Sequence, residues 1–431
     1  MEELGFNSTQ LDNGLQVITQ EMHHAPVASF WVWYRVGSRN EGPGLSGASH
    51  WVEHMLFRGT ERFPGNAVHK LVSREGGVRN GFTYIDYTAY FETLPADRID
   101  LALQLESDRM INARFMPDDV EAERTIILSE RAGRENTPGF LLDEALNAAA
   151  FPHHPYGHTV IGSRADLLSM TRDDLWHHYR TYYGPNNAIA VAIGDFETAA
   201  MLERVAQLFG PAQPSGVTIP PVTAGDYEQT EMRRVEVTGD SRVAYVELAF
   251  RAPHALHADF FPLVVLDAVL SGGKSPSAFG GEGLGRSARI YRRLVDTGLA
   301  ASAGSFIRPS IDPHLFSFSA TVRAEQSPAA VEAALWEVID GAAAGDISEA
   351  EVVRAIKQSR AQFAYGRESI SQQAYWLGFS SVVTSVDWLA RYLDSMAAVT
   401  VDDVRRVAAA YLQRARCIAG WYVPRNGQNQ G

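Results

Sequence analysis

Apolar and polar residues along the first half of the chain follow two periodicities in turn. Segments rich in β-branched and aromatic residues predict strands, and they are residues 15–19, 28–34, 82–84 and 87–94. Segments with helical spacing of apolar residues are residues 46–58, 66–75, 96–114 and 118–134. This order predicts an α+β half, in which an antiparallel sheet is covered by helices.

The second half repeats elements of the first. A segment rich in Pro and Gly, residues 211–230, predicts a linker. Strands are predicted at residues 234–237 and 243–250, beyond it. Thr171 and Asp174 have the spacing of a helix capping box, and Thr400 and Asp403 repeat it, each followed by a Tyr and a short apolar run. We therefore expect two homologous halves, 1–210 and 231–431, that face each other as a clamshell.

Composition narrows the classes of function. At 431 residues the chain exceeds a single core, and 45% hydrophobic with 21% charged residues is typical of a globular protein. The net charge of −13 argues against nucleic acid and fits cationic partners such as basic peptides. The single cysteine, Cys417, excludes an intrachain disulfide and a thiolate metal cluster, and its apolar neighbours predict a buried thiol.

The sequence gives little indication of a compartment. Residues 1–4 begin no basic and apolar leader, so no signal peptide is visible. No run of 18 apolar residues predicts a membrane span. These features favour the cytoplasm, with a periplasmic or organellar location if a leader has been removed.

The predicted helix 46–58 carries His50-Trp51-Val52-Glu53-His54. His50 and His54 are one turn apart on one face, with Glu53 beside them. Two such imidazoles can chelate one zinc ion and leave a carboxylate within reach of a metal-bound water. The alternative is two unrelated helical histidines beside a solvated Glu.

The predicted helix 118–134 can supply the remaining ligand. Glu123 and Glu130 are two turns apart and point the same way, whereas Glu121 lies off this face. A zinc site with two His needs a third protein ligand, and a further carboxylate can hold a ligand imidazole. The alternative for both residues is a solvated helix face.

The motif and its surroundings resemble the pitrilysin-like, mitochondrial-processing-peptidase-type zinc metallopeptidases, whose mark is the inverted motif H-x-x-E-H of the inverzincins. The matching blocks are residues 11–15, 37–41, 50–60, 80–83, 123–130, 186–188 and 193–196.

The resemblance implies one Zn²⁺ per chain, held by His50, His54 and Glu130. It also implies Glu53 as general base and Glu123 as a supporting carboxylate. Asn80 and the strand near Phe82 would line the substrate cleft, although Asn80 can equally be a hairpin residue that bonds its own backbone.

The second half departs from the family pattern. Around residues 261–270 it has no His pair, and Val295 and Ala301 stand where self-sufficient members have an Arg and a Tyr that bind substrate and the developing oxyanion. The departure implies a heterodimer in which a sister subunit supplies that Arg and Tyr, with Arg292 or Arg293 as substitute donors and a homodimer as alternatives.

A glycine-rich segment, residues 271–286, contains Gly272-Gly273-Lys274-Ser275. It is not a phosphate-binding loop, because Ala268 stands where that motif requires its first Gly. It resembles the glycine-rich loop of the non-catalytic subunit of mitochondrial processing peptidase. Contact with substrate or partner and a plain flexible connection both remain open.

Together these features predict a zinc metalloendopeptidase that cleaves peptides or unfolded segments as the zinc-bearing subunit of a heterodimer. The alternative is a non-catalytic core or assembly subunit that keeps the peptidase fold. A third possibility is a zinc ion with a purely structural role.

Overall fold

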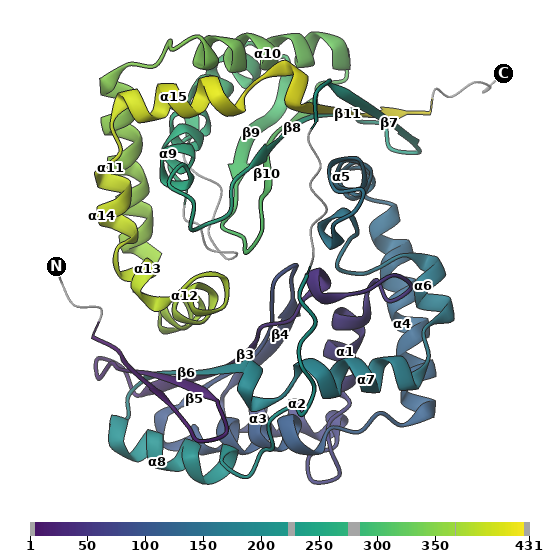
Figure 1. Cartoon of the computed structure of the whole chain (residues 1–431), viewed down its shortest axis with the longest axis vertical. Coiled ribbons are helices and arrows are strands. Elements are labelled where there is room, and N and C mark those ends of the chain that lie inside the picture. The colour runs from purple at the N-terminus through teal and green to yellow at the C-terminus, as the bar shows by residue number, and fades with distance from the viewer. Residues whose placement is uncertain (1–4, 223–228, 275–284, 367, 426–431) are drawn as a thin grey trace. The chain divides into compact units, whose positions relative to one another are not determined.

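The structure is a computed structural model that describes residues 5–222, 229–274, 285–366 and 368–425 (Figure 1). The chain forms two compact units. The first unit contains residues 1–131, 158–223 and 367–390, and the second contains 132–157, 224–366 and 391–431. Each unit is built around one sheet.

The sheet of the first unit has the order β1-β2-β6-β3-β5-β4. Its strands are β1 (Asn7–Gln10), β2 (Gln16–Glu21), β3 (Val27–Tyr34), β4 (Val78–Thr83), β5 (Thr88–Pro95) and β6 (Ala188–Gly194). The two central strands, β3 and β6, are almost entirely buried, since apolar side chains cover both of their faces. β4 lies at one edge, so one side of its backbone has no neighbouring strand among the described residues.

The sheet of the second unit has the order β7-β11-β8-β10-β9. Its strands are β7 (Arg233–Gly239), β8 (Tyr245–Ala252), β9 (Ala300–Ile307), β10 (His314–Val322) and β11 (Cys417–Pro424). Order and strand directions match β2-β6-β3-β5-β4, which confirms the predicted homology of the halves. Neither sheet is wholly antiparallel, because β2–β6 and β7–β11 are parallel pairs, which distant parts of the chain form.

The predicted helices appear with small shifts in their ends. In the first unit lie α1 (Ala48–Phe57), α2 (Gly65–Arg74), α3 (Asp100–Asn112), most of α4 (Pro117–Glu135), α6 (Arg164–Ser169), α7 (Arg172–Tyr182), α8 (Thr198–Phe209), α12 (Ile370–Val383) and α13 (Val386–Ala390). The predicted helix 96–114 begins instead as a 3-10 turn, Ala96–Arg98, before α3. In the second unit lie α5 (Pro138–Ala150), α9 (Phe260–Ser271), α10 (Pro328–Ala343), α11 (Glu349–Gly366), α14 (Tyr392–Ala397), α15 (Val401–Tyr411) and a π-helical turn, Tyr291–Val295.

Both predicted capping boxes are present. The Thr171 hydroxyl accepts from the backbone N–H of Asp174 at the start of α7, and Thr400 does the same with Asp403 at the start of α15. Each helix leads into the strand that follows it, β6 or β11. The repeat seen in the sequence is therefore a repeat of structure.

Two helices belong to the unit opposite to the one that their position in the sequence predicts, with residues 211–230 as the dividing linker. α12 packs on β3 and β6 of the first unit, and α5 packs on β7, β8 and β11 of the second. Glycines allow these close approaches. A Cβ on Gly378 would meet the Trp33 indole at 2.0 Å, and one on Gly420 would meet Leu142 at 2.8 Å. The compact units thus differ from 1–210 and 231–431, because the apolar faces of these helices are buried on the other sheet.

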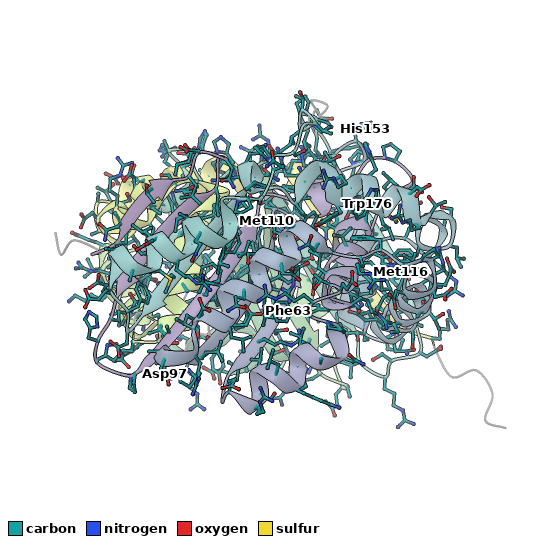
Figure 2. The ribbon with its side chains drawn as sticks, turned by 90° about the horizontal axis from the view of Figure 1, so that it is seen from below. Phe63, Asp97, Met110, Met116, His153 and Trp176 are labelled. Atoms are coloured by element: carbon teal, nitrogen blue, oxygen red, sulfur yellow. The ribbon has the colours of Figure 1, made fainter. Side chains whose placement is uncertain are left out.

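The start of α4 is fixed by aromatic packing against α7. The Phe115 ring lies 5.4 Å from Trp176 and 5.2 Å from Tyr179. The Tyr179 hydroxyl donates to the carbonyl of Met110, at 2.7 Å. Met110, Met116 and Trp176 mark this region in Figure 2. These contacts fix α7 against the end of α3 and against Phe115, which lies two residues before α4 begins.

Among the described helices, none has a stretch long and apolar enough for a membrane crossing. Cys417 is a free, fully buried thiol, as predicted.

Candidate metal centre

The helix α1 is anchored at its start. The Glu41 carboxylate accepts from the backbone N–H groups of Gly47 and Ser49, each at 2.8 Å. It thereby caps orphan donors at the N-terminus of α1, where Gly47 itself has no capping side chain and a φ of 94°. Burial raises the pKa of Glu41 to about 8, against the opposing effect of these hydrogen bonds. Behind the histidines, Trp51, Val52, Met55 and Leu56 bury the helix in the core.

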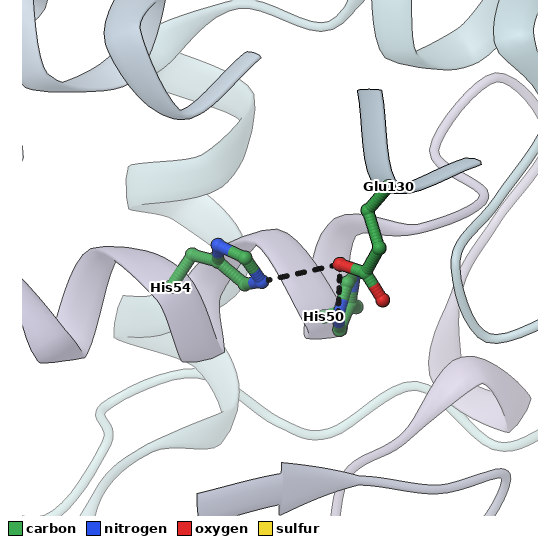
Figure 3. Close-up of side chains that lie close together, drawn as sticks. All are labelled: His50, His54 and Glu130. Carbon is green, nitrogen blue, oxygen red and sulfur yellow. Dashed lines mark ion pairs between the residues drawn. The ribbon is translucent and has the colours of Figure 1, made fainter. Parts of the chain in front are cut away.

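The structure brings the three sequence-predicted ligands together (Figure 3). Nε2 of His50 lies 3.6 Å from Oε2 of Glu130, and Nε2 of His54 lies 3.7 Å from the same oxygen. One ligand atom from each of the three side chains lies within 4.8 Å of the other two. Glu130 comes from α4, so two helices distant in sequence supply the cluster. No other such group occurs among the described residues.

A further carboxylate orients one of the imidazoles. Oε2 of Glu123 lies 2.7 Å from Nδ1 of His54, and Oε1 accepts from Nε of Arg58 at 2.6 Å. Burial opposes ionisation of Glu123, but the hydrogen bond from His54 and the charges of His54 and Arg58 outweigh it and hold the pKa of Glu123 below its ordinary value. Ionised Glu123 accepts the Nδ1–H of His54, so when this imidazole is neutral its lone pair is on Nε2, the nitrogen directed at the cluster.

Glu53 lies beside the cluster, with one of its oxygens already engaged. Thr83 of β4 donates its hydroxyl hydrogen to Oε2 of Glu53, at 2.6 Å. The Glu53 side chain is buried, and burial raises its pKa, against the opposing effect of the Thr83 bond. The sequence did not single out Thr83 as a partner, although it lies in the block 80–83 that carries the resemblance.

The two cleft residues named from the sequence have local contacts. Oδ1 of Asn80 accepts from the backbone N–H of Gly81 at 3.0 Å, which supports the reading of a hairpin residue that bonds its own backbone. Phe82 packs against Trp31 and Trp33 at centroid distances of 6.1 and 5.9 Å. Both residues lie on the edge strand β4.

In the second unit, Val295 ends the π-helical turn and Ala301 lies exposed on β9. Of the two arginines named as substitute donors, Arg293 is paired with Glu337 at 2.7 Å. Most of the glycine-rich segment, residues 275–284, lies outside the described residues.

The donor set fits zinc. Two imidazole nitrogens and one carboxylate oxygen are typical of zinc sites that retain a fourth position for water or substrate. The hydrogen bond that fixes the orientation of His54 is a usual companion of such ligands. The spacing of donor atoms around a common centre is compatible with one ion held by all three.

Comparison with known proteins assigns the class. Residues 16–164 match the family model described as insulinase (peptidase family M16), and residues 169–359 match that of the peptidase M16 inactive domain. This chain belongs to peptidase family M16, which confirms the resemblance seen in the sequence.

Relatives cover nearly the whole chain. It is 30% identical over 412 residues to an uncharacterized zinc protease of Mycobacterium tuberculosis, covering 94% of this chain and 90% of that protein. It is 27% identical to a probable mitochondrial-processing peptidase subunit beta of Arabidopsis thaliana, covering 94% of this chain and 76% of that protein. Among solved structures, a protease from Helicobacter pylori matches with a TM-score of 0.91 and 28% identity, covering 97% of this chain and 99% of that one.

Proposed function

We propose that this chain is a zinc-dependent endopeptidase that cleaves peptides or unfolded segments. His50, His54 and Glu130 are its zinc ligands, and Glu53 is its general base. The convergence of two imidazoles and a carboxylate from α1 and α4, with Glu53 beside them, carries the proposal. Relatives named zinc proteases support it.

A zinc ion in this site would act as a Lewis acid and lower the pKa of a bound water. Glu53 accepts the proton of the attacking water and passes it to the leaving amine. The Thr83 hydroxyl holds Oε2 of Glu53, so Oε1 is the oxygen that takes the proton. Glu123 keeps His54 in the tautomer that directs Nε2 to the metal.

The substrate strand has a place to bind in this proposal. β4 is an edge strand, and an extended peptide can pair with such an edge through backbone hydrogen bonds. The backbone of Phe82, as part of β4, would then take part in pairing with the peptide. Asn80 contributes less, because its side chain is engaged with the neighbouring backbone.

The chain acts as one half of a heterodimer. A tetrahedral oxyanion needs positioned hydrogen-bond donors besides the metal. Each donor stabilises the transition state by about 3 kcal/mol. Val295 and Ala301 have side chains that cannot donate a hydrogen bond. Arg293 is held by Glu337. A sister chain of similar length, with an Arg and a Tyr at these places, would complete the site.

The metal assignment is tested by zinc content and by cleavage of an unstructured peptide. His50→Ala, His54→Ala and Glu130→Gln should each abolish stoichiometric zinc. Glu53→Gln should retain zinc and lose cleavage, since it removes the base and leaves the ligands. Glu61→Gln, an exposed residue near the same helix, is the control. Full zinc retention by the His50/His54 double variant would end the assignment.

The heterodimer is tested by activity with and without the sister chain. The isolated chain should bind one zinc and cleave slowly, and the sister should restore turnover. Full turnover by the purified chain alone would refute the heterodimer and leave the peptidase assignment standing. Zinc without cleavage in either preparation would favour the non-catalytic core subunit.

A further inference from the structure

The second unit contains a counterpart of the region around Glu53. Equivalent strand registers place Phe82 opposite Ala89, and Phe306 opposite Ser317. Along the chain, the helix α1 follows β3 in the first unit, and the helix α9 follows β8 in the second unit. The helix α9 therefore stands in the second unit where α1 stands in the first, with β9 in the place of β4.

Asp267 of α9 has surroundings like those of Glu53. Glu53 receives the hydroxyl hydrogen of Thr83 from the edge strand β4. Asp267 receives that of Ser305 from the edge strand β9, at 2.5 Å, and Ser305 lies two positions before the equivalent of Thr83 on its strand. The residues three before and one after Glu53 are histidines, whereas those around Asp267 are Val264 and Ala268. A carboxylate is retained here, but the imidazole ligands are not.

A lysine ammonium lies against this carboxylate. Nζ of Lys274 is 3.1 Å from each oxygen of Asp267, and it donates to the hydroxyl of Ser271 at 2.8 Å and to the carbonyl oxygen of Ser305. Asp267 is buried, and burial raises its pKa while Lys274 lowers it. A buried carboxylate without a cation would be costly, and Lys274 supplies that cation.

The ammonium lies beside a small pocket that opens on the same helix. Its lining includes Val264, Asp267 and Ala268 of α9, Phe306 of β9 and Ser359 of α11. The oxygen acceptors around Nζ come from Asp267, Ser271 and Ser305, and their geometry suits the three N–H donors of a primary ammonium. The charge is thus compensated inside the unit and needs no metal.

We propose that Asp267, Ser271 and Ser305 form a binding site for a primary ammonium ion, and that Lys274 occupies this site from within the chain. The comparison of this site with the zinc centre rests on the proposed function. The contacts of Lys274 with Asp267, Ser271 and Ser305 are independent of that proposal. The Lys in Gly273-Lys274-Ser275 therefore serves an internal cation site, which agrees with the rejection of a phosphate-binding loop.

The test is chemical rescue of the Lys274→Ala variant by an added ammonium salt. The measured quantity is the midpoint of thermal unfolding of the full chain. The variant should have a midpoint several degrees below that of the native chain, because a buried charge has lost its partner. Ethylammonium chloride at tens of millimolar should recover at least half of the loss. Tetramethylammonium, which has no N–H donor, should recover none. Lys357→Ala, an exposed lysine on α11, is the matched control and should show neither effect.

The double variant Asp267→Asn/Lys274→Ala should show no ethylammonium rescue. An unchanged midpoint in Lys274→Ala, or equal rescue by the two salts or in the double variant, would overturn the proposal. Reductive methylation of the native chain needs no variant. Lys274 should react at least tenfold more slowly than Lys357, and equal rates would also overturn it. Unfolding and labelling do not depend on cleavage, so failure here leaves the zinc assignment untouched.

Discussion

The substitution Glu123→Gln tests how much Glu123 contributes to zinc affinity. In the proposed site Glu123 orients the ligand His54 but does not itself bind the metal. Glu123 joins two donors, Nδ1 of His54 at 2.7 Å and Nε of Arg58 at 2.6 Å. A glutamine of the same shape has one acceptor oxygen, and its amide nitrogen must face the other donor. Either His54 or Arg58 therefore loses its partner, and the negative charge beside His54 is removed.

The expected magnitude follows from these contacts. Loss of an outer hydrogen-bond partner of a metal-bound His weakens metal affinity by about 10–100-fold. This corresponds to about 1.4–2.8 kcal/mol. Because Glu123 is ionised and only one of its two bonds can persist, we expect a loss near the middle of this range, about 30-fold. Cleavage at saturating zinc should fall much less, since the ligands and Glu53 remain.

Zinc affinity is measured by titration against a competing chelator, with thermal unfolding of the zinc-free chain as a check on folding. Glu121→Gln is the matched control, because Glu121 lies on the same helix but its side chain is 67% exposed and forms an ion pair with Arg124. The control should bind zinc like the native chain. A Glu123→Gln variant that is folded and binds zinc within twofold of the native chain would refute this account of His54.

Two further predictions concern stability. Glu41→Gln places an amide nitrogen against a backbone N–H at the start of α1, so it should lower the free energy of unfolding by about 1–3 kcal/mol in chemical denaturation; an unchanged value would show that the cap is dispensable. Gly378→Ala should destabilise by about 1–3 kcal/mol, because the new Cβ meets the Trp33 indole at 2.0 Å. The same change at Gly133, where a Cβ meets nothing within 4 Å, should stabilise by about 0.5–1 kcal/mol; equal effects at the two glycines would count against the packing argument.

Local sequence determined the helices and the direction of their side chains. The spacing of His50 and His54 follows from helical geometry alone, so their shared face was predictable before any tertiary contact was known. The capping boxes at Thr171 and Thr400 were predictable for the same reason, since each depends on residues three apart in sequence. Homology of the halves was visible through those caps.

Tertiary structure decided which distant groups meet. The bond from Thr83 to Glu53 joins a strand to a helix 30 residues away, and the Glu41 cap is set by a loop whose path no periodicity describes. The exchange of α5 and α12 between the two linear halves was likewise invisible, because an amphipathic helix shows that it buries a face and not which sheet covers it. The sequence alone thus determined which face of each helix is apolar, and long-range packing determined which sheet covers that face.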